Sequence, residues 1–254
     1  MRTALTLDCD PGHDDAIAIL LALGDPGADL RAVTTVSGNG ALDGPALPPP
    51  GAIALDPRPA HVVLAAECDN WVAVGPLTNV ADALDRGARP RGRLVVMGGS
   101  TGRGNTTPLA EFNVLCDPES ADVCLRAGLD LTLIGLNVTH QALATPARTA
   151  RLPRVVREWL DVFAAAYRER FGFPAPPLHD PVAVAALLEP AVVEEVECFV
   201  GIELAGTLTR GATVCDLHGR LGRPANARVA VALDAERFWW LVDRALARLP
   251  ALAG

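Results

Sequence analysis

The chain has 254 residues, half of them hydrophobic, and its formal net charge is −8 at pH 7. This acidic balance argues against a nucleic acid partner, because binding to a phosphate backbone relies on basic side chains. No apolar stretch is long enough to span a membrane, no signal-peptide pattern precedes the first strand and the six cysteines form no C-x-x-C pair, so we expect a cytoplasmic protein that contacts neither nucleic acid nor membrane.

Strand-like apolar runs alternate with helical patterns along the chain. In chain order, we predict elements at residues 5–8 (strand), 14–23 (helix), 30–36 (strand), 71–74 (strand), 77–84 (helix), 94–97 (strand), 118–127 (helix), 131–136 (strand), 155–170 (helix), 182–188 (helix), 199–204 (strand), 229–233 (strand) and 235–249 (helix). This alternation predicts a single α/β domain over residues 1–254, with a mostly parallel, doubly wound (Rossmann-like) sheet and helices on both faces. Two Gly- and Pro-rich segments, 40–59 and 171–177, are predicted surface loops, and the second could also be a lid over a site.

Four aspartates follow the first predicted strand within eight positions: Asp8, Asp10, Asp14 and Asp15. Two carboxylates about 4 Å apart repel by roughly 4 kcal/mol at an effective dielectric constant of about 20. Alternation places Asp8 and Asp10 on one face of the strand and Cys9 on the other, and the last two aspartates fall in the first turn of the next helix. A single aspartate would be interpreted as a cap or a structural acceptor. Four together favour a divalent cation with oxygen ligands at the carboxyl end of the sheet.

Further polar side chains follow the ends of later predicted strands. Asn39 comes directly after the second strand, and Asn105, Glu111 and Asn113 lie in the segment that follows the strand at 94–97. A turn is the simpler interpretation of any single asparagine. The last three together can instead form a cradle for hydroxyl groups, because amide and carboxylate side chains bind vicinal diols.

His179 and Asp180 immediately precede the predicted helix at 182–188. Asp180 could simply cap that helix. His179 could serve as a general acid, because the ordinary pKa of histidine lies near neutrality.

A series of short motifs runs from near the N-terminus to the predicted last helix: DCDPGHDDA (8–16), TTVSGN (34–39), GPLTN (75–79), VMGG (96–99), GN (104–105), AEFN (110–113), DPE (117–119), GLNVTHQAL (135–143) and HDP (179–181). Together, and in this order, they closely resemble the inosine–uridine preferring nucleoside hydrolase family. The first motif is the most specific of them.

The resemblance implies that the chain hydrolyses the N-glycosidic bond of ribonucleosides to ribose and a free base, using a water activated by Ca²⁺. It implies that Ca²⁺ is held by the carboxylates of Asp10, Asp15 and Asp180 and by the backbone carbonyl of Val74. Asp10 would also take a proton from the attacking water, and His179 would protonate the departing base. Substrate-binding roles are implied for Asp14, Asn39, Met97, Asn105, Glu111 and Asn113.

The chain is shorter than the family pattern, which predicts an internal deletion after Asn39. One helix–strand unit, about 30 or more residues with its connections, is expected to be missing there. The lost strand would be an edge strand, so the core could survive. Its loss would expose the edge of the neighbouring strand and would remove a loop that is expected to cover the base. We therefore expect the metal and ribose sites to persist while base recognition is degraded. Tyr167, Phe171 and Phe173 are aromatic candidates near the base, and a homo-oligomer is possible.

Other functions stay open at the level of sequence. The chain could be a catalytically impaired ribose- or nucleoside-binding relic of the same fold. Asp8-x-Asp10 after a strand also fits a haloacid-dehalogenase-type phosphatase superficially, but that chemistry usually uses a lysine and the chain contains none. The absence of lysine further excludes P-loop and Schiff-base mechanisms.

Overall fold

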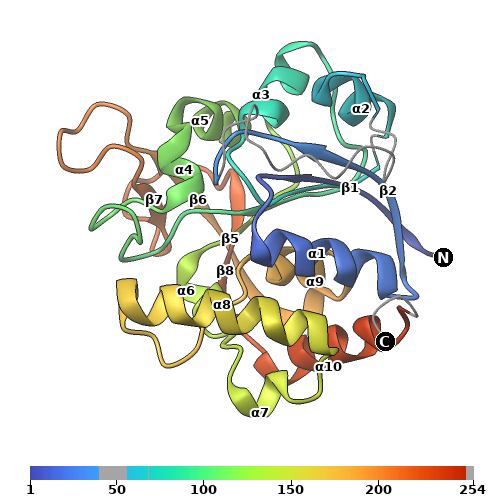
Figure 1. The fold of residues 1–254 in the computed structure, drawn as a ribbon. Helices are drawn as coiled ribbons and strands as arrows, with labels where there is room; N and C mark the ends of the chain where they lie inside the picture. The colour runs from blue at the N-terminus through green and yellow to red at the C-terminus, as the bar shows by residue number, and fades with distance from the viewer. Residues whose placement is uncertain (40–55, 68, 250–254) are drawn as a thin grey trace.

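The computed structural model describes residues 1–39, 56–67 and 69–249. In this part of the chain, an eight-stranded sheet has the order β2-β1-β3-β4-β5-β8-β6-β7 (Figure 1). The strands are β1 (Thr3–Cys9), β2 (Ala28–Thr35), β3 (Trp71–Ala73), β4 (Leu94–Met97), β5 (Leu131–Ile134), β6 (Val193–Ile202), β7 (Thr213–Asp216) and β8 (Ala227–Leu233). The first six strands in this order, β2-β1-β3-β4-β5-β8, pair in parallel. Strand β6 runs antiparallel to both of its neighbours, β8 and β7. The predicted mostly parallel sheet is confirmed.

The central strands are apolar throughout because both of their faces are covered. Every residue of β3, β4 and β5 is buried, as expected for parallel strands between two helical layers. In β1 the side chains alternate, so Leu5, Leu7 and Cys9 join one hydrophobic core while Thr6 and Asp8 face the other side. The predicted placement of the Cys9 side chain on the face opposite Asp8 is therefore confirmed.

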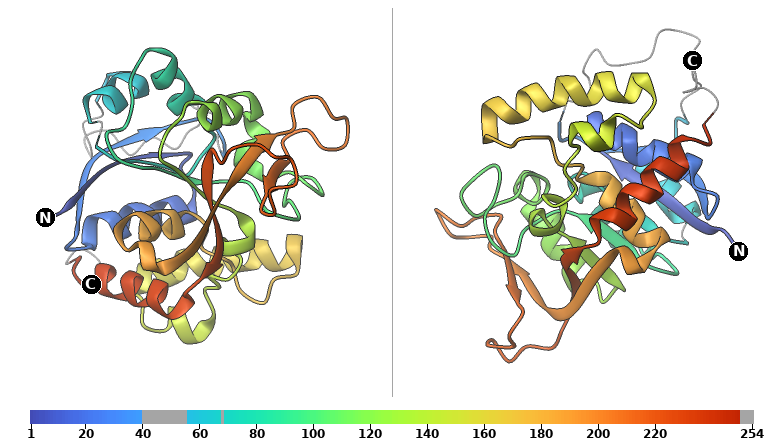
Figure 2. Two further views of the ribbon diagram at one scale, coloured as in Figure 1. Left: turned by 180° about the vertical axis from the view of Figure 1, so that it is seen from behind. Right: turned by 90° about the horizontal axis from the view of Figure 1, so that it is seen from below.

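Helices cover both faces of the sheet (Figures 1 and 2). One layer contains α1 (His13–Gly24), α6 (Leu136–Thr139), α7 (Pro146–Thr149), α8 (Arg154–Phe171), α9 (Asp180–Leu188), with a 3₁₀ turn at Pro190–Val192, and α10 (Ala235–Leu246). The other contains α2 (Ala60–Ala66), α3 (Thr78–Asp85), α4 (Phe112–Cys116) and α5 (Pro118–Arg126). Each layer encloses its own hydrophobic core, which confirms the doubly wound α/β prediction. Among the described helices, none has both the length and the apolar character needed to cross a lipid bilayer.

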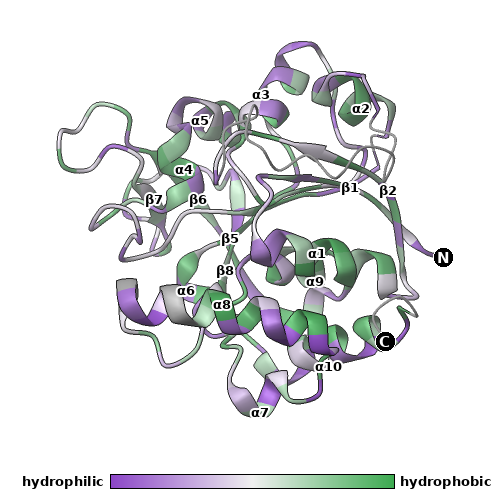
Figure 3. Ribbon diagram, viewed as in Figure 1, coloured by the Kyte–Doolittle hydropathy of each residue, from purple (hydrophilic) through white to green (hydrophobic). Residues whose placement is uncertain are grey.

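Helix α9 matters most for the site because it is buried along almost its whole length, from Asp180 to Leu187. It packs against α1 on one side and lies beneath β3 and β4 on the other. A helix enclosed in this way is apolar all round, and it is correspondingly green in Figure 3. The core therefore fixes the position of Asp180.

Several element boundaries differ from the sequence prediction. The strand predicted at 131–136 ends at Ile134, because Gly135 leads directly into α6. The strand predicted at 199–204 is the second half of the longer β6. β7 and the helices α2, α4, α6 and α7 were missed, since elements this short owe their existence to packing more than to local propensity. The loop predicted at 40–59 lies mostly outside the described residues.

The second predicted loop is anchored where it meets α9. Leu178 N–H donates to the carbonyl of Ala142 at 3.0 Å, and Ala144 N–H donates to the carbonyl of Pro176 at 2.8 Å. These bonds favour a fixed connection over a lid for the second half of the 171–177 segment.

Candidate active site

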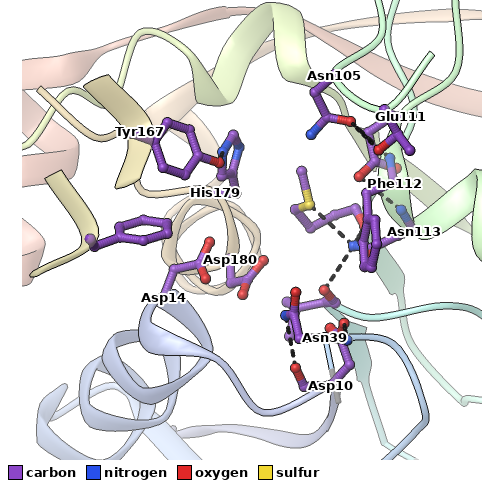
Figure 4. Close-up of a pocket in the computed structure, with 14 residues that line it drawn as sticks. Asp10, Asp14, Asn39, Asn105, Glu111, Phe112, Asn113, Tyr167, His179 and Asp180 are labelled. Carbon is purple, nitrogen blue, oxygen red and sulfur yellow. Dashed lines mark hydrogen bonds between the residues drawn. The ribbon is translucent and has the colours of Figure 1, made fainter. Parts of the chain in front are cut away.

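A cavity of about 260 Å³ opens at the carboxyl end of the parallel strands (Figure 4). Open α/β sheets bind their ligands at this edge. The predicted site residues that line the cavity are Asp10, Asp14, Asn39, Val74, Met97, Asn105, Glu111, Asn113, His179 and Asp180. The remaining predicted residue, Asp15, is buried at the start of α1. Side chains from widely separated parts of the sequence therefore meet in one place.

Asp14, Asp15 and Asp180 form the acidic centre of the site. Each offers a carboxylate oxygen, and these oxygens all lie within 4.8 Å of one another. Two helices bring them together, since α1 begins just after Gly12, whose N–H donates to Asp15 Oδ2 at 2.8 Å, and α9 begins at Asp180. Asp10, predicted to share a metal with Asp15 and Asp180, lies outside this tight group.

Asp10 sits in a cradle that only small residues can form. Asn39 N–H donates to Asp10 Oδ2 at 2.8 Å, and Asn39 Nδ2 donates to the Asp10 carbonyl at 2.9 Å. A Cβ atom on Gly38 would lie 2.1 Å from Asp10 Oδ2, and one on Gly75 would lie 2.8 Å from Oδ1. The two glycines therefore leave the space that the carboxylate occupies.

Burial raises the pKa of all four carboxyls in this region. For Asp10, burial is the largest cause, the charges of Asp14 and Glu111 add to it, and the pKa reaches about 7. The pKa of Asp14 rises to about 6, again mainly through burial. Burial, together with the charges of the neighbouring carboxylates, raises the pKa of both Asp15 and Asp180. Without a cation, these groups therefore keep their protons to a higher pH than exposed carboxyls do.

The donor set fits a hard divalent cation. Asp15 Oδ1 is buried and, in the part of the chain described, has no hydrogen-bond partner. The Val74 carbonyl accepts a hydrogen bond from Asn113 Nδ2 at 2.9 Å, which leaves its second lone pair for another contact. Carboxylate and carbonyl oxygens are the ligands that Ca²⁺ prefers.

A polar wall stands opposite the acidic centre. Glu111 caps α4: its carboxylate accepts from Gly99 N–H at 2.9 Å and from Asn113 N–H at 2.9 Å. Asn105 Oδ1 accepts from Phe112 N–H at 3.0 Å. Backbone donors therefore fix the orientation of these side chains, as the predicted hydroxyl cradle requires.

His179 is enclosed by two hydroxyl groups. Its Nδ1 lies 2.8 Å from Thr139 Oγ1, and its Nε2 lies 2.8 Å from the Tyr167 hydroxyl. Burial, with a smaller contribution from nearby His140, lowers its pKa to about 3. The imidazole is therefore neutral at physiological pH, which differs from the near-neutral pKa assumed for a general acid.

Tyr167 and Phe163 line the cavity from α8, one turn apart. The sequence indicates Tyr167 only as one of several aromatic candidates, and it missed Phe163 and Thr139. Phe163 and Tyr167 are four residues apart in a predicted helix, which places both aromatic rings on one face. This spacing was the signal from which Phe163 could have been predicted. Of the other candidates, Phe173 lies beside His140, and the side chain of Phe171 lies outside the described part.

Asp8 lies behind the cavity and supports it. Thr34 Oγ1 donates to its carboxylate at 2.6 Å, and Asn79 Nδ2 donates to the same oxygen at 2.9 Å. Burial raises its pKa to about 6 in spite of these two hydrogen bonds. The side chain links β1, β2 and α3 below the acidic centre.

This fold and this cavity define a doubly wound α/β protein with an acidic centre beside a polar wall. The chain belongs to the inosine-uridine preferring nucleoside hydrolase family, whose sequence model matches residues 5–47 and 42–240. It is therefore a nucleoside hydrolase, an enzyme that acts on N-glycosyl compounds, and the family resemblance seen in the sequence is confirmed.

Relatives match the chain over nearly its full length. The pyrimidine-specific ribonucleoside hydrolase RihA of Shewanella sp. (strain ANA-3) is 38% identical over 311 residues, covering 97% of both chains. RihA of Escherichia coli (strain K12) is 35% identical, covering 94% of this chain and 96% of the relative. Among solved structures, a plant nucleoside hydrolase, PpNRh1, has a TM-score of 0.87 at 25% identity, covering 97% of this chain and 100% of the other. The purine-preferring ribonucleoside hydrolase from Gardnerella vaginalis has a TM-score of 0.81 at 25% identity, covering 97% and 99%.

Proposed function

We propose that this chain hydrolyses the N-glycosidic bond of ribonucleosides to ribose and a free base, with Ca²⁺ at the acidic centre. One observation carries the proposal: a single cavity joins clustered carboxylates to an oriented wall of amide and carboxylate groups. Pyrimidine nucleosides are the proposed substrates, because relatives that match nearly the whole chain are named pyrimidine-specific ribonucleoside hydrolases.

The proposed Ca²⁺ ligands are the carboxylates of Asp10, Asp15 and Asp180 and the carbonyl oxygen of Val74. When bound, the ion supplies a positive charge that neutralises the carboxylates and lowers the pKa of a water molecule. The raised pKa values of Asp15 and Asp180 support this set, because these carboxyls hold protons where a cation would otherwise neutralise them.

Asp10 is the proposed acceptor of the proton that the attacking water loses. The water oxygen attacks C1′ of the sugar while its proton moves to the Asp10 carboxylate. A general base works best when its pKa lies near the working pH, and burial places that of Asp10 at about 7. Asn39 N–H holds one of its oxygens in place at 2.8 Å.

The ribose is proposed to lie between the acidic centre and the polar wall. The side chains proposed to contact it are those of Asp14, Asn39, Met97, Asn105, Glu111 and Asn113. Their orientation precedes substrate binding, which lowers the cost of positioning the sugar. As the C1′–N bond breaks, positive charge develops on the sugar, and the surrounding carboxylates stabilise that charge.

The departing base requires a proton, and we propose that the Tyr167 hydroxyl delivers it. If Thr139 O–H donates to Nδ1 of His179, then Nε2–H donates to the Tyr167 oxygen, and the Tyr167 O–H is proposed to point towards the base when substrate is bound. The hydrogen bond from His179 then stabilises the tyrosinate that forms, and solvent water returns the proton. His179 thus acts through Tyr167, which its 2.8 Å contact supports.

We further propose that the chain lacks the helix–strand unit expected after Asn39. The family match is divided into two segments that overlap at residues 42–47. The alignment to the Shewanella relative extends over 311 residues, although this chain has 254. In the described sheet, β2 is the edge strand that the missing strand would have covered.

Hydrolysis of uridine, inosine and a p-nitrophenyl riboside, each measured with EDTA and after Ca²⁺ is restored, tests the proposal. We expect cleavage that EDTA abolishes and Ca²⁺ recovers. A protein that binds Ca²⁺ and ribose by calorimetry but cleaves none of the three substrates would instead be the ribose-binding relic of the fold.

A further inference from the structure

A second cavity, of about 570 Å³, adjoins the first, and the two share Asn105 and Tyr167 in their linings. Figure 4 shows these two side chains facing each other across one end of the first cavity, with Asp10 at the opposite end. The second cavity is bounded by the loop at 100–105 on one side and by His140 and Phe173 on the other. A nucleoside whose ribose fills the first cavity therefore directs its base towards the second.

The two cavities differ in the ionisable groups that line them. Four carboxylates, those of Asp10, Asp14, Glu111 and Asp180, line the first. None of the described residues that line the second cavity is a carboxylate, and Arg103 contributes a guanidinium to it. Within the described residues, Arg103 is the one permanently charged cation that lines either cavity, because arginine keeps its charge at any pH relevant here.

Arg103 is also available to a ligand. Its guanidinium forms no ion pair or hydrogen bond with any described residue. The neighbouring Asn137 is held by two bonds, since its Oδ1 accepts from Thr101 N–H at 3.3 Å and its Nδ2 donates to the Ala230 carbonyl at 2.9 Å, and it carries no charge. Burial lowers the pKa of His140, which keeps that ring neutral. The second cavity thus offers Arg103 as its free charged donor.

We infer that Arg103 stabilises the negative charge that develops on the departing base, an inference that rests on the proposed function. When the C1′–N bond breaks, its electron pair goes to the base nitrogen, and the charge spreads onto the adjacent carbonyl oxygen of a pyrimidine. The sugar becomes positive at the same moment. Carboxylates at one end and a guanidinium at the other therefore match the charge separation of this step. The base nitrogen is then protonated, and Arg103 itself gives up no proton.

The loss of rate expected on removing the Arg103 guanidinium depends on how exposed that group is to solvent. Removing a buried donor of this kind costs about 10²–10³-fold in rate. Arg103 is exposed, so solvent screens its charge, and we expect a loss of roughly tenfold instead.

The test compares Arg103→Met with the wild-type enzyme on uridine and on p-nitrophenyl riboside. Nitrophenolate is stable as an anion and needs little help to leave, whereas uracil is a poor leaving group. The variant should lose about tenfold in kcat/KM on uridine and less than about twofold on the nitrophenyl riboside. Arg103→Lys should retain part of the activity, and Arg157→Met, which removes an exposed arginine of α8 outside both cavities, should change neither rate.

The outcomes separate this inference from the proposed function. Equal losses on the two substrates, or no loss on uridine, would overturn the role of Arg103 while the nucleoside hydrolase proposal stands. A wild-type enzyme inactive on both substrates would overturn the two together. The melting temperature of each variant, measured alongside, distinguishes a lost contact from a lost fold.

Discussion

Replacing Asp10 by asparagine should stabilise the metal-free protein at alkaline pH and abolish its activity. Asp10 is 2% exposed, and burial, together with the charges of Asp14 and Glu111, raises its pKa from 3.8 to about 7. The folded protein therefore holds this proton more tightly than the unfolded chain does. Such a group contributes its full stability below the unfolded pKa and loses it as the pH rises through the folded pKa. For Asp10, the loss occurs between about pH 4 and about pH 7.

The magnitude follows from the same values. A pKa raised from 3.8 to about 7 corresponds to a loss of about 4 kcal/mol above neutrality, at roughly 1.36 kcal/mol per pH unit. Asparagine carries no charge and still accepts the hydrogen bond from Asn39 N–H. Water in the open cavity solvates part of the Asp10 charge, so about half of this amount should be regained. Because 1 kcal/mol shifts the midpoint by about 2–4 °C in a chain of this size, we expect a melting temperature about 5 °C above wild type.

Calorimetric unfolding in EDTA at about pH 8 and about pH 5 measures the effect, and the difference should shrink to less than about half at the lower pH. Added Ca²⁺ should raise the midpoint of the wild type and leave that of the variant unchanged. Asp117→Asn is a control of opposite sign. Burial acts to raise the pKa of Asp117, but hydrogen bonds from Thr78 and Ser120 outweigh it and lower that pKa, so this variant should lose stability at alkaline pH. The reasoning is refuted if Asp10→Asn gains nothing in EDTA at alkaline pH, or gains equally at both pH values.

Three further substitutions test other parts of the site. Tyr167→Phe should lower kcat/KM for uridine by about 10²-fold, as expected for a lost general acid, and affect p-nitrophenyl riboside far less; equal losses would exclude the proton-transfer role. Gly38→Ala should abolish the Ca²⁺-dependent rise in melting temperature, because its Cβ would lie 2.1 Å from Asp10 Oδ2; an undiminished rise would show that the cradle can relax. Thr213→Val removes a hydroxyl that accepts from Ser100 N–H and donates to the Ser100 carbonyl, each at 2.8 Å. The loop that carries the polar wall should loosen, and KM should rise about fivefold with kcat nearly unchanged, whereas Thr213→Ser should restore KM; a fall in kcat alone would contradict a positioning role.

The sequence could predict the sheet and the acidic cluster because both depend on patterns among residues that are close together in the sequence. Alternating strands and helices imply a doubly wound sheet, and Asp10, Asp14 and Asp15 lie within six consecutive positions. Asp180 is distant in sequence, and its place in the cluster was implied only by the family resemblance, to which the His-Asp-Pro motif contributes. The contacts of His179 could not be foreseen, because Thr139 and Tyr167 approach it from α6 and α8 through tertiary packing alone.

The protonation state of His179 could not be predicted from the sequence, because it also depends on tertiary packing. The ordinary pKa of histidine is a property of the exposed side chain, whereas burial and nearby His140 lower the pKa in the folded protein to about 3. Desolvation depends on how many atoms surround a group, and no local pattern reports that number. The same packing also raises the pKa of Asp10 and Asp14.

The arrangement of the site explains how the proposed loss of a helix–strand unit can be tolerated. Asp10 follows β1, Val74 follows β3 and Met97 ends β4, so the acidic centre and the sugar wall rest on strands that are buried between the two cores. The proposed missing strand would have paired with β2 at the edge of the sheet, outside that framework. The base end depends instead on α8 and on the loop that carries Arg103, which contribute side chains to the second cavity. Loss of a unit at the sheet edge should therefore leave the binding of the metal and of the ribose intact.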